Sequence, residues 1–329
     1  MATPWEVRYH KGVHLPQIGW SLDAQSRTER SFVSHAHADH IARHKEILCT
    51  PATARFLHAR MPGRRIVTEL PFGRTQPLEF GVTATLHAAG HILGSSQILL
   101  ESAEHGSLLY TGDFKLRPGL AAEACATPRA DLLIMETTFG LPRYVFPPEG
   151  EVIAQLVAFC QQAVADGATP ALLCYSLGKS QEVLCALAAA GLPVMLQAET
   201  LRLTRIYEDL GVKFPAFREF DHREAGGHVV ICPSHSIGLL SRVPAVRTAA
   251  ITGWALDPGA IYRLRCTAAF PLSDHADFPS LLRFVELVQP KRVLTLHGFA
   301  REFASTLRAR GIDALALGHA NQLDLSLSG

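Results

Sequence analysis

Residues 34–40 read Ser-His-Ala-His-Ala-Asp-His, so four possible metal ligands fall within six residues directly after a short apolar run. If that run ends a strand, His35 and His37 point to the same side, because side chains two residues apart share a face of extended chain. Asp39 and His40 then lie where the chain turns, which we expect to lead into a helix beginning near His40, and their side chains reach a second spot. A histidine pair and an Asp-His pair on one turn suggest two adjacent ions, and imidazole and carboxylate donors without thiolate suit catalytic Zn²⁺ or Mn²⁺ better than a closed structural zinc.

The alternative for this stretch is a polar loop with surface histidines. It is disfavoured because further candidate ligands follow expected strands downstream. His91 lies in a glycine-flanked loop after the alternating run at residues 82–89, and Asp113 ends another strand in a Gly-Asp pair. Glu136 and His297 also stand at the ends of apolar strands. A carboxylate at Asp113 could bridge two ions, whereas Glu136 is either an acid beside the metal site or a cap of a loop or helix.

Composition limits the kinds of partner that the chain can have. Its 329 residues are 48% hydrophobic and 19% charged, which suffices for one large or two medium domains. A formal net charge of +1 gives no global basic field, so a nucleic acid would be held by a local groove and by metal ions. Seven cysteines without a Cys-x-x-Cys pair predict reduced thiols in a cytoplasmic protein. No apolar signal core opens the sequence, and no stretch approaches the ~18 apolar residues of a membrane span.

From about residue 146 to about residue 265, strand and helix patterns alternate with short loops, which predicts a second unit built on a parallel α/β sheet. One of its strand-to-helix turns carries Ser176 and Lys179, which together with backbone N–H groups offer a binding site for a phosphate. His235 stands after another strand and is a similar candidate for substrate binding. The alternative is that all three are ordinary turn residues, because many strand-to-helix turns have this composition.

The order of the motifs, His-x-His-x-Asp-His, then a histidine, then Gly-Asp and finally a strand followed by histidine, resembles the metallo-β-lactamase fold. Glu136, the interposed α/β unit and the stretches at 273–277 and 296–298 resemble more narrowly the β-CASP nucleases. These include Artemis and its crosslink-repair relatives, RNase J and the cleavage-and-polyadenylation endonuclease. Residues 175–182 look like the helix that opens their β-CASP domain. The length of the chain and the residues of these motifs are most similar to those of the bacterial DNA-ligase-associated exonucleases.

The resemblance implies an α/β fold, namely an αββα metallo-β-lactamase sandwich with an inserted β-CASP α/β domain. Residues 1–145 and 266–329 would form the two parts of the sandwich, and residues 146–265 would form the insertion.

The resemblance also implies two divalent ions, Zn²⁺ or Mn²⁺, which would activate water for attack on a phosphodiester. The first ion would be held by His35, His37, His91 and Asp113, and the second by Asp39, His40, Asp113 and His297. Asp39 would therefore be a ligand as well as a catalytic residue.

Other residues would support the reaction. The leaving oxygen needs a proton, and His275 is our candidate donor, because an imidazole with a reference pKa of ~6.5 can donate near neutral pH. Glu136 would assist it, and the alternative for His275 is a structural histidine at a helix start. Asp23, after an expected strand at residues 17–23, is either a turn residue or a carboxylate that orients a ligand histidine from behind.

We therefore expect a metal-dependent phosphodiesterase, most similar to DNA exonucleases that act from 5′ ends in DNA repair. Its expected partner is nucleic acid, above all DNA, and an ATP-dependent DNA ligase and a helicase are expected functional associates. His297 is present as in RNase J but unlike the Artemis branch, so a ribonuclease stays open. A small-molecule hydrolase of the glyoxalase or lactamase type would share the ligands without needing the inserted unit. A non-catalytic subunit would lack ligands that are all present here.

Overall fold

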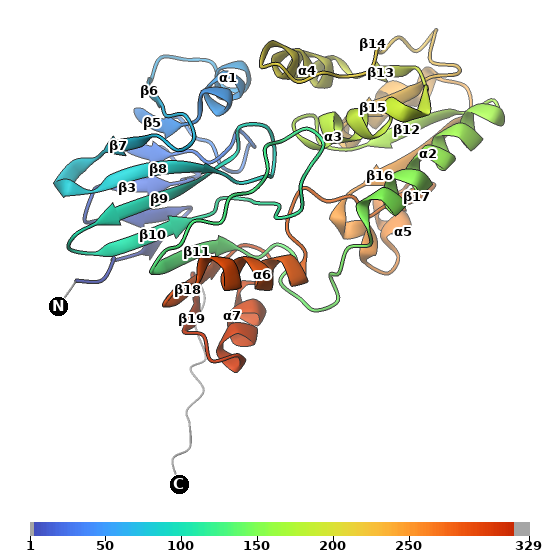
Figure 1. Cartoon of the computed structure of the whole chain (residues 1–329). Coiled ribbons are helices and arrows are strands. Elements are labelled where there is room, and N and C mark those ends of the chain that lie inside the picture. Colours follow the sequence, from blue (N-terminus) through green and yellow to red (C-terminus); the bar gives the residue numbers. More distant parts are fainter. Residues whose placement is uncertain (1–2, 319–329) are drawn as a thin grey trace.

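The computed structural model describes residues 3–318 and divides the chain into two lobes (Figure 1). Both ends of the chain contribute to one lobe, which contains two sheets, and the middle of the chain forms the other, which contains a third sheet. None of the helices in this range has the length and apolar character that spanning a bilayer requires.

The first sheet has six strands that lie side by side in sequence order. Their bounds are Arg8–Tyr9 (β1), Val13–Leu15 (β2), Trp20–Leu22 (β3), Arg30–Phe32 (β4), Glu46–Cys49 (β5) and Ile66–Glu69 (β6). Strands β3 to β6 are parallel, so β3 and β4 finish at the same end of the sheet. Asp23 follows β3 and residues 34–40 follow β4, which brings these two segments together.

The second sheet has seven strands in the order β19-β18-β11-β10-β9-β8-β7. Their bounds are Thr75–Pro77 (β7), Thr83–Ala88 (β8), Ser96–Ser102 (β9), Gly106–Tyr110 (β10), Leu132–Glu136 (β11), Arg292–Leu296 (β18) and Ala314–Ala316 (β19). Strands β10, β11 and β18 are parallel, and β8 points the same way as β10 because both are antiparallel to β9. The carboxyl ends of these four strands therefore lie at one end of the sheet, next to His91, Asp113, Glu136 and His297.

The two sheets pack face to face around an apolar core. Trp20 and Phe32 from the first sheet meet Leu86, Ile98 and Ile134 from the second in one buried cluster. Burying a leucine or phenylalanine side chain contributes about 1.5–3 kcal/mol, so this cluster supplies much of the free energy that holds the sheets together.

Helices cover the outer faces of both sheets. Helix α1 (Pro51–Arg60) buries Leu57 beside residues of β5, and helices α6 (Phe278–Val288) and α7 (Ala300–Ala309) bury Phe284 and Phe303 against the second sheet. Figure 1 shows α1 on one side of the paired sheets and α6 and α7 on the other. The order of layers is helix, sheet, sheet, helix, which confirms the αββα sandwich predicted from the sequence.

The third sheet has six strands in the order β14-β13-β15-β12-β16-β17, and every neighbouring pair is parallel. Its strands are Thr169–Leu173 (β12), Val194–Leu196 (β13), Phe217–Glu219 (β14), Val229–Cys232 (β15), Val246–Ile251 (β16) and Ala268–Phe270 (β17). The helices of this lobe are Glu149–Ala165 (α2), Lys179–Ala186 (α3), Ala198–Asp209 (α4) and Ala260–Leu264 (α5). Short 3₁₀ helices lie at Glu79–Gly81 (η1), Ala188–Ala190 (η2), Ser234–Arg242 (η3) and Gly253–Leu256 (η4). The alternation of strand and helix confirms the predicted parallel α/β unit.

The third sheet extends past residue 265, where we expected the inserted unit to end, because β17 pairs with β16. The division of the chain into domains at residues 1–145, 146–265 and 266–329 stays a prediction.

The helix expected near His40 does not form, and that prediction was wrong. The N–H of Lys45 already donates to Thr28 and that of Glu46 to Glu29, at the start of β5. Only four residues remain between His40 and this segment, which is too few for a stable helix. The connection is a turn closed by a bond from the His40 N–H to the His37 carbonyl.

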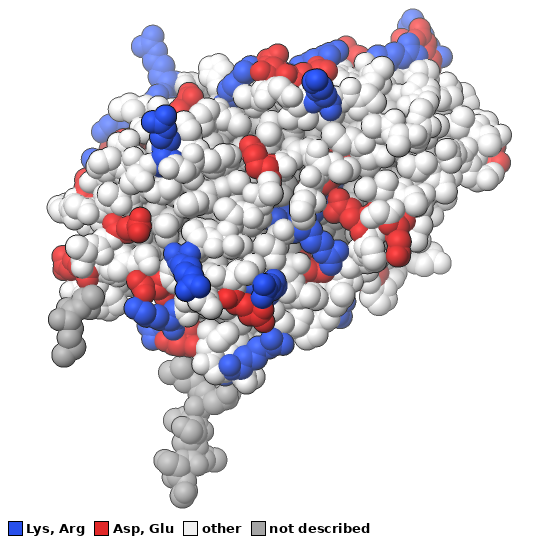
Figure 2. Space-filling model, in the orientation of Figure 1, with Lys and Arg blue, Asp and Glu red and all other residues white. Residues whose placement is uncertain are grey.

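Charged side chains of both signs are interspersed on the face shown in Figure 2, and uncharged residues cover most of it. This face has no broad basic area, in keeping with a formal net charge of +1. Binding of a polyanion there would depend on local groups rather than on bulk charge.

Candidate metal centre

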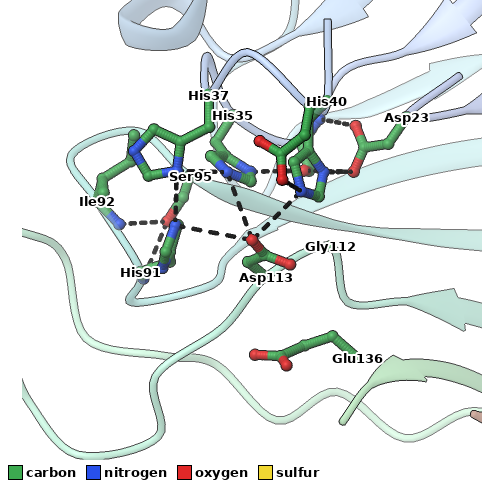
Figure 3. Close-up of polar contacts among 12 residues, drawn as sticks. Asp23, His35, His37, His40, His91, Ile92, Ser95, Gly112, Asp113 and Glu136 are labelled. Atoms are coloured by element: carbon green, nitrogen blue, oxygen red, sulfur yellow. Dashed lines mark hydrogen bonds and ion pairs between the residues drawn. The ribbon is translucent and has the colours of Figure 1, made fainter. Parts of the chain in front are cut away.

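The ends of the two sheets bring a group of four donors together in space. One ligand atom from each of His35, His37, His91 and Asp113 lies within 4.8 Å of the others (Figure 3). Three of these side chains are buried, and His37 is half-buried. The sequence predicted this set as the first metal site, and the fold places its members side by side although the chain separates them by up to 78 positions (113 − 35).

A second group shares Asp113 with the first. It consists of His40, Asp113 and His297, whose ligand atoms also lie within 4.8 Å of one another. The Oδ2 atom of Asp113 is 3.2 Å from Nε2 of His40, 3.7 Å from Nε2 of His35 and 3.9 Å from Nε2 of His91. Asp113 therefore stands between the two groups, where a carboxylate could serve both.

Asp39 lies at the margin of the second group. Its carboxylate is 3.7 Å from Nε2 of His40 but 72% exposed, and it is not among the donors that converge on Asp113. Its role as a ligand stays a prediction.

The outer ring nitrogens of the first three histidines bond to oxygens that can only accept. Nε2 of His37 is 3.0 Å from the carbonyl of Leu177, and Nδ1 of His91 is 2.8 Å from the carbonyl of Asp274. Nδ1 of His35 is 2.9 Å from Oγ of Ser34, whose own proton is donated to Asp23. Each ring therefore carries its proton on the outer nitrogen.

The inner nitrogens of the same three rings are consequently unprotonated, and each presents a lone pair to the site. Nε2 of His35 lies 3.0 Å from Nδ1 of His37, which lies 3.1 Å from Nε2 of His91. Burial lowers the pKa of all three imidazoles, that of His91 to about 3, so they are neutral at pH 7. Three lone pairs facing one another at these distances repel unless a cation lies between them.

This arrangement fits a metal ion. Ligand nitrogens at the usual Zn–N distance of about 2.0–2.1 Å in a tetrahedral site stand roughly 3.3 Å apart, close to the separations observed here. The donors are imidazoles and a carboxylate, which suit Zn²⁺ or Mn²⁺. Histidine ligands that donate their outer N–H to an oxygen are the usual pattern at protein metal sites.

Asp23 orients the ligand rings from behind. Its carboxylate accepts hydrogen bonds from the N–H and Oγ of Ser34 (2.7 and 2.6 Å), from Nδ1 of His40 (3.0 Å) and from the hydroxyl of Tyr110 (2.9 Å). The Ser34 hydroxyl that donates to Asp23 also accepts from Nδ1 of His35, so Asp23 holds that ring in place as well. Of the two interpretations open from the sequence, this geometry favours the orienting carboxylate.

His40 differs from the other histidines in its charge. Burial opposes ionisation, but contact with Asp113 and Asp23 outweighs it and raises the pKa of His40 well above its usual value. Without a metal ion, His40 is thus an imidazolium that donates from both nitrogens. A cation at the second group would replace the proton on Nε2, because a histidine ligand must be deprotonated.

Two residues at the site hold backbone conformations that are uncommon outside glycine. Asp23 has a φ of 47° and His297 a φ of 59°. Such conformations cost about 1–3 kcal/mol and persist where the surrounding structure imposes them, which is common at functional sites. At both positions the turn directs the side chain from the end of a strand toward the ligand cluster.

Glu136 and His275 form a buried pair beside Asp113. Nδ1 of His275 donates to Oε1 of Glu136 at 3.0 Å, and one ligand atom from each of Asp113, Glu136 and His275 lies within 4.8 Å of the others. Burial would lower the pKa of His275, but the carboxylates of Glu136, Asp113 and Asp274, above all that of Glu136, outweigh this and raise the pKa to about 9. His275 is therefore protonated at neutral pH in the metal-free chain and is only 21% exposed.

Lys179 does not lie where a substrate phosphate could reach it. Its ammonium is 2% exposed and 3.2 Å from Oδ1 of Asp274, so a buried carboxylate already neutralises it. Ser176 is half-buried in the same turn, and His235 is exposed at the start of η3. In the described part of the chain, the His235 side chain forms no hydrogen bond with a candidate ligand. The pairing with Asp274 disfavours phosphate binding by Lys179, and substrate binding by Ser176 and His235 stays a prediction.

The sequence analysis did not identify Asp274, Ser34 or Tyr110 as site residues. Asp274 orients His91 through its carbonyl and pairs with Lys179 through its carboxylate. Ser34 and Asp274 each precede a predicted site histidine, which was an available signal. Nothing local marks Tyr110, because it is a strand residue whose hydroxyl meets Asp23 only in the folded chain.

Comparison with known proteins shows which proteins this chain is similar to. A family model described as "Zn-dependent metallo-hydrolase RNA specificity domain" matches residues 261–317. A protein of Opitutus terrae named "Probable DNA ligase" is 59% identical over 326 residues, which are 98% of this chain and 32% of that protein. The 5′ exonuclease Apollo of Rattus norvegicus is 27% identical over 305 residues, 87% of this chain and 54% of that protein. The chain is thus similar to metallo-β-lactamase-fold β-CASP nucleases over most of its length, and residues 261–317 match a zinc-dependent metallo-hydrolase model.

One further relative and one solved structure are also similar to this chain. An RNase J-like protein of Methanocaldococcus jannaschii is 27% identical over 210 residues, 54% of this chain and 49% of that protein. A protein of unknown function from Enterococcus faecalis V583 shares the fold, with a TM-score of 0.60 at 13% identity over 83% of this chain and 76% of that one. The chain spans 32% and 54% of the first two relatives. The match to a zinc-dependent metallo-hydrolase model implies divalent metal ions, and the site above offers donors for them.

Proposed function

We propose that this chain is a metal-dependent nuclease that removes nucleotides from the 5′ end of DNA during DNA repair. The observation that carries the proposal is the convergence of three bare imidazole nitrogens on Asp113, with a second donor group on its other side. A centre of this kind, at the end of a β-CASP fold, fits phosphodiester hydrolysis better than the other reactions considered.

Two Zn²⁺ or Mn²⁺ ions would be held by the ligands that the sequence predicted: the first by His35, His37, His91 and Asp113, the second by His40, Asp113 and His297 with Asp39 at its margin. Bound there, divalent ions would supply Lewis-acid polarisation of the scissile phosphodiester and activation of water.

Other side chains would position the ligand histidines and give a proton to the leaving oxygen. Asp23 holds His40, and through Ser34 it holds His35, so the ligand nitrogens stay aimed inward. The Glu136 carboxylate accepts from Nδ1 of His275 and leaves the Nε2 proton of that ring free to be given to the leaving oxygen. The reaction needs this proton because the 3′ oxygen leaves as an alkoxide.

Two comparisons bear on the substrate. The name of the rat relative is that of a 5′ exonuclease, and the bacterial relative that matches nearly all of this chain is named as a DNA ligase. An exonuclease that acts beside a ligase would trim ends that the ligase then joins. We therefore propose DNA as the substrate and a DNA ligase as the functional partner.

A ribonuclease is the second candidate. It is favoured by the RNA specificity domain at residues 261–317 and by the RNase J-like relative. His297, which completes the second donor group, was also the residue that kept this candidate open from the sequence.

Digestion of matched, 3′-labelled single strands of DNA and RNA, with and without a 5′-phosphate, tests the proposal. With Mn²⁺ or Zn²⁺ we expect DNA to shorten from its 5′ end, and chelator to stop the reaction. An Asp113→Ala variant should be inactive, whereas Asp221→Ala, which changes an exposed acid of the other lobe, should retain activity. Faster digestion of RNA would favour the second candidate. Intact nucleic acids together with rapid hydrolysis of a lactam or thioester would contradict both.

A further inference from the structure

Tyr175 presents an aromatic ring to solvent at the edge of the metal centre. The residue is 72% exposed, and its ring centroid lies 6.2 Å from that of His37 with 38° between the planes. It belongs to the turn between β12 and α3, so the middle lobe supplies it to a site whose ligands come from the sandwich. An exposed tyrosine beside a ligand has a free face on which another flat group can pack.

The backbone around Tyr175 is fixed although its ring is free. The carbonyl of Tyr175 accepts from the N–H and Oγ of Ser180, at 3.1 and 2.6 Å. Two residues later, the carbonyl of Leu177 accepts from Nε2 of His37 at 3.0 Å. The turn is therefore tied both to its own helix and to a metal ligand, which fixes the backbone from which the ring projects beside the centre.

The charges near the ring indicate which part of a nucleotide could lie there. The carboxylate of Asp39 is 72% exposed and acts electrostatically on Tyr175, so it would repel a phosphate as long as it holds no cation. The converging donors around Asp113 instead provide the place for the phosphate once cations are bound. An uncharged flat group is left for the surface that Tyr175 offers, and in a nucleic acid that group is the base.

We propose that the Tyr175 ring stacks on the nucleobase next to the phosphodiester at the metal centre. This inference rests on the proposed nuclease function and adds a positioning residue to it. Every base has a flat π face, so stacking on Tyr175 holds the strand without selecting a sequence. It would also act on DNA and RNA alike.

Fluorescence of an oligonucleotide with 2-aminopurine at its 5′ nucleotide and uncleavable phosphorothioate linkages tests this with the zinc-loaded chain. We expect quenching on binding to the wild type. Tyr175→Ala should weaken binding about 5- to 150-fold and abolish the quenching, whereas Tyr175→Phe should preserve both. Tyr262→Ala, which removes an 87% exposed tyrosine from α5, is the matched control and should behave as the wild type.

Three outcomes would overturn the inference, and thermal unfolding of each variant establishes that it is folded. Equal affinity and equal quenching in Tyr175→Ala and the wild type would show that the ring does not stack. Equal losses in Tyr175→Phe and Tyr175→Ala would assign the effect to the hydroxyl instead of the ring. A wild type that neither binds nor shortens any oligonucleotide would remove the proposed function as well, so the two failures are distinguishable.

Discussion

At the scale of single residues, the centre depends on side chains that touch no substrate. Asp23 is 4% exposed and accepts four hydrogen bonds, two of them from Ser34. A buried carboxylate with this many donors is fixed in position, and it fixes the rings of His35 and His40 in turn. The arrangement of the donors is therefore built into the fold before any ion arrives.

Asp23→Asn should weaken metal binding without a large change in shape. The amide replaces one accepting oxygen with an NH₂ group, so Ser34, His40 and Tyr110 cannot all keep their bonds. Loss of such an outer partner lowers metal affinity about 10- to 100-fold, which competition with a chromogenic chelator measures. Asp221→Asn, at an exposed acid, is the control; equal affinities in both variants and the wild type would show that Asp23 does not orient the ligands.

In the metal-free chain, His275 should titrate at a pKa of about 9, as followed by NMR of its ring protons. Glu136→Gln removes the carboxylate that contributes most to raising this pKa, so the pKa should fall, although Asp113 and Asp274 still raise it. The same shift makes the stability of the fold depend on pH. Because the folded pKa lies above the unfolded value, the pair stabilises fully below about pH 6.5 and loses this contribution as pH rises through about 9. A His275 pKa that does not change in the variant would exclude Glu136 as the cause.

At the scale of elements, the ends of strands place the ligands. Asp113, Glu136 and His297 could be predicted because each stands at or shortly after the end of an apolar strand, and parallel strands finish at the same end of a sheet. The wrong helix near His40 had a different cause. Its sequence permits a helix, but the early start of β5 leaves no room for one, and only the pairing of strands reveals that.

Gly112→Ala tests the close approach of the two sheets at the centre. Gly112 has a φ of 56°, and a Cβ there would lie 2.5 Å from both Cβ and Oγ of Ser34. We expect a loss of about 2–5 kcal/mol in the free energy of unfolding from backbone strain and overpacking together, measured by urea denaturation. Gly73→Ala has a similar φ of 72° but open space, so it should lose only the backbone part, about 1–2 kcal/mol. Equal losses would mean that the sheets do not approach closely at Ser34.

At the scale of the whole molecule, the two lobes are joined by polar contacts around the centre. Lys179 was predicted to bind phosphate because its local sequence resembles a phosphate-binding turn. Its actual partner, Asp274, is 95 positions away (274 − 179), and no local pattern predicts such a pair. The lobes themselves were predictable, since helical and strand periodicities are local, whereas the contacts between lobes are not.

Glu182→Gln should loosen the junction between the lobes. Glu182 of α3 accepts from the N–H groups of Leu120 and Ala121 and lies 3.1 Å from Nζ of Lys115. Glu149 remains 3.0 Å from Nζ of Lys115, so the loss should be smaller than the loss of about 3–5 kcal/mol for a buried charge left without any partner; denaturant unfolding at pH 7 measures it. Glu199→Gln, which breaks an exposed pair with Arg202, should cost about 0–1 kcal/mol.

The cost of Glu182→Gln should also depend on pH. Burial would raise the pKa of Glu182, but Lys115, the Leu120 N–H and Lys179 together outweigh it and lower the pKa below the usual 4.5. The ionised pair therefore stabilises the protein above about pH 4.5, and this contribution is lost as pH falls through the folded pKa. The difference between wild type and variant should shrink on acidification. A difference that is constant with pH would show that the charge of Glu182 plays no part.

The most direct test of the central claim is anomalous diffraction from crystals of the chain grown with Mn²⁺ or Zn²⁺. We predict two peaks about 3.5–4 Å apart with the Asp113 carboxylate between them, one beside His35, His37 and His91 and the other beside His40 and His297. Peaks only at other places, or no peak at these donors in metal-saturated crystals, would contradict the account.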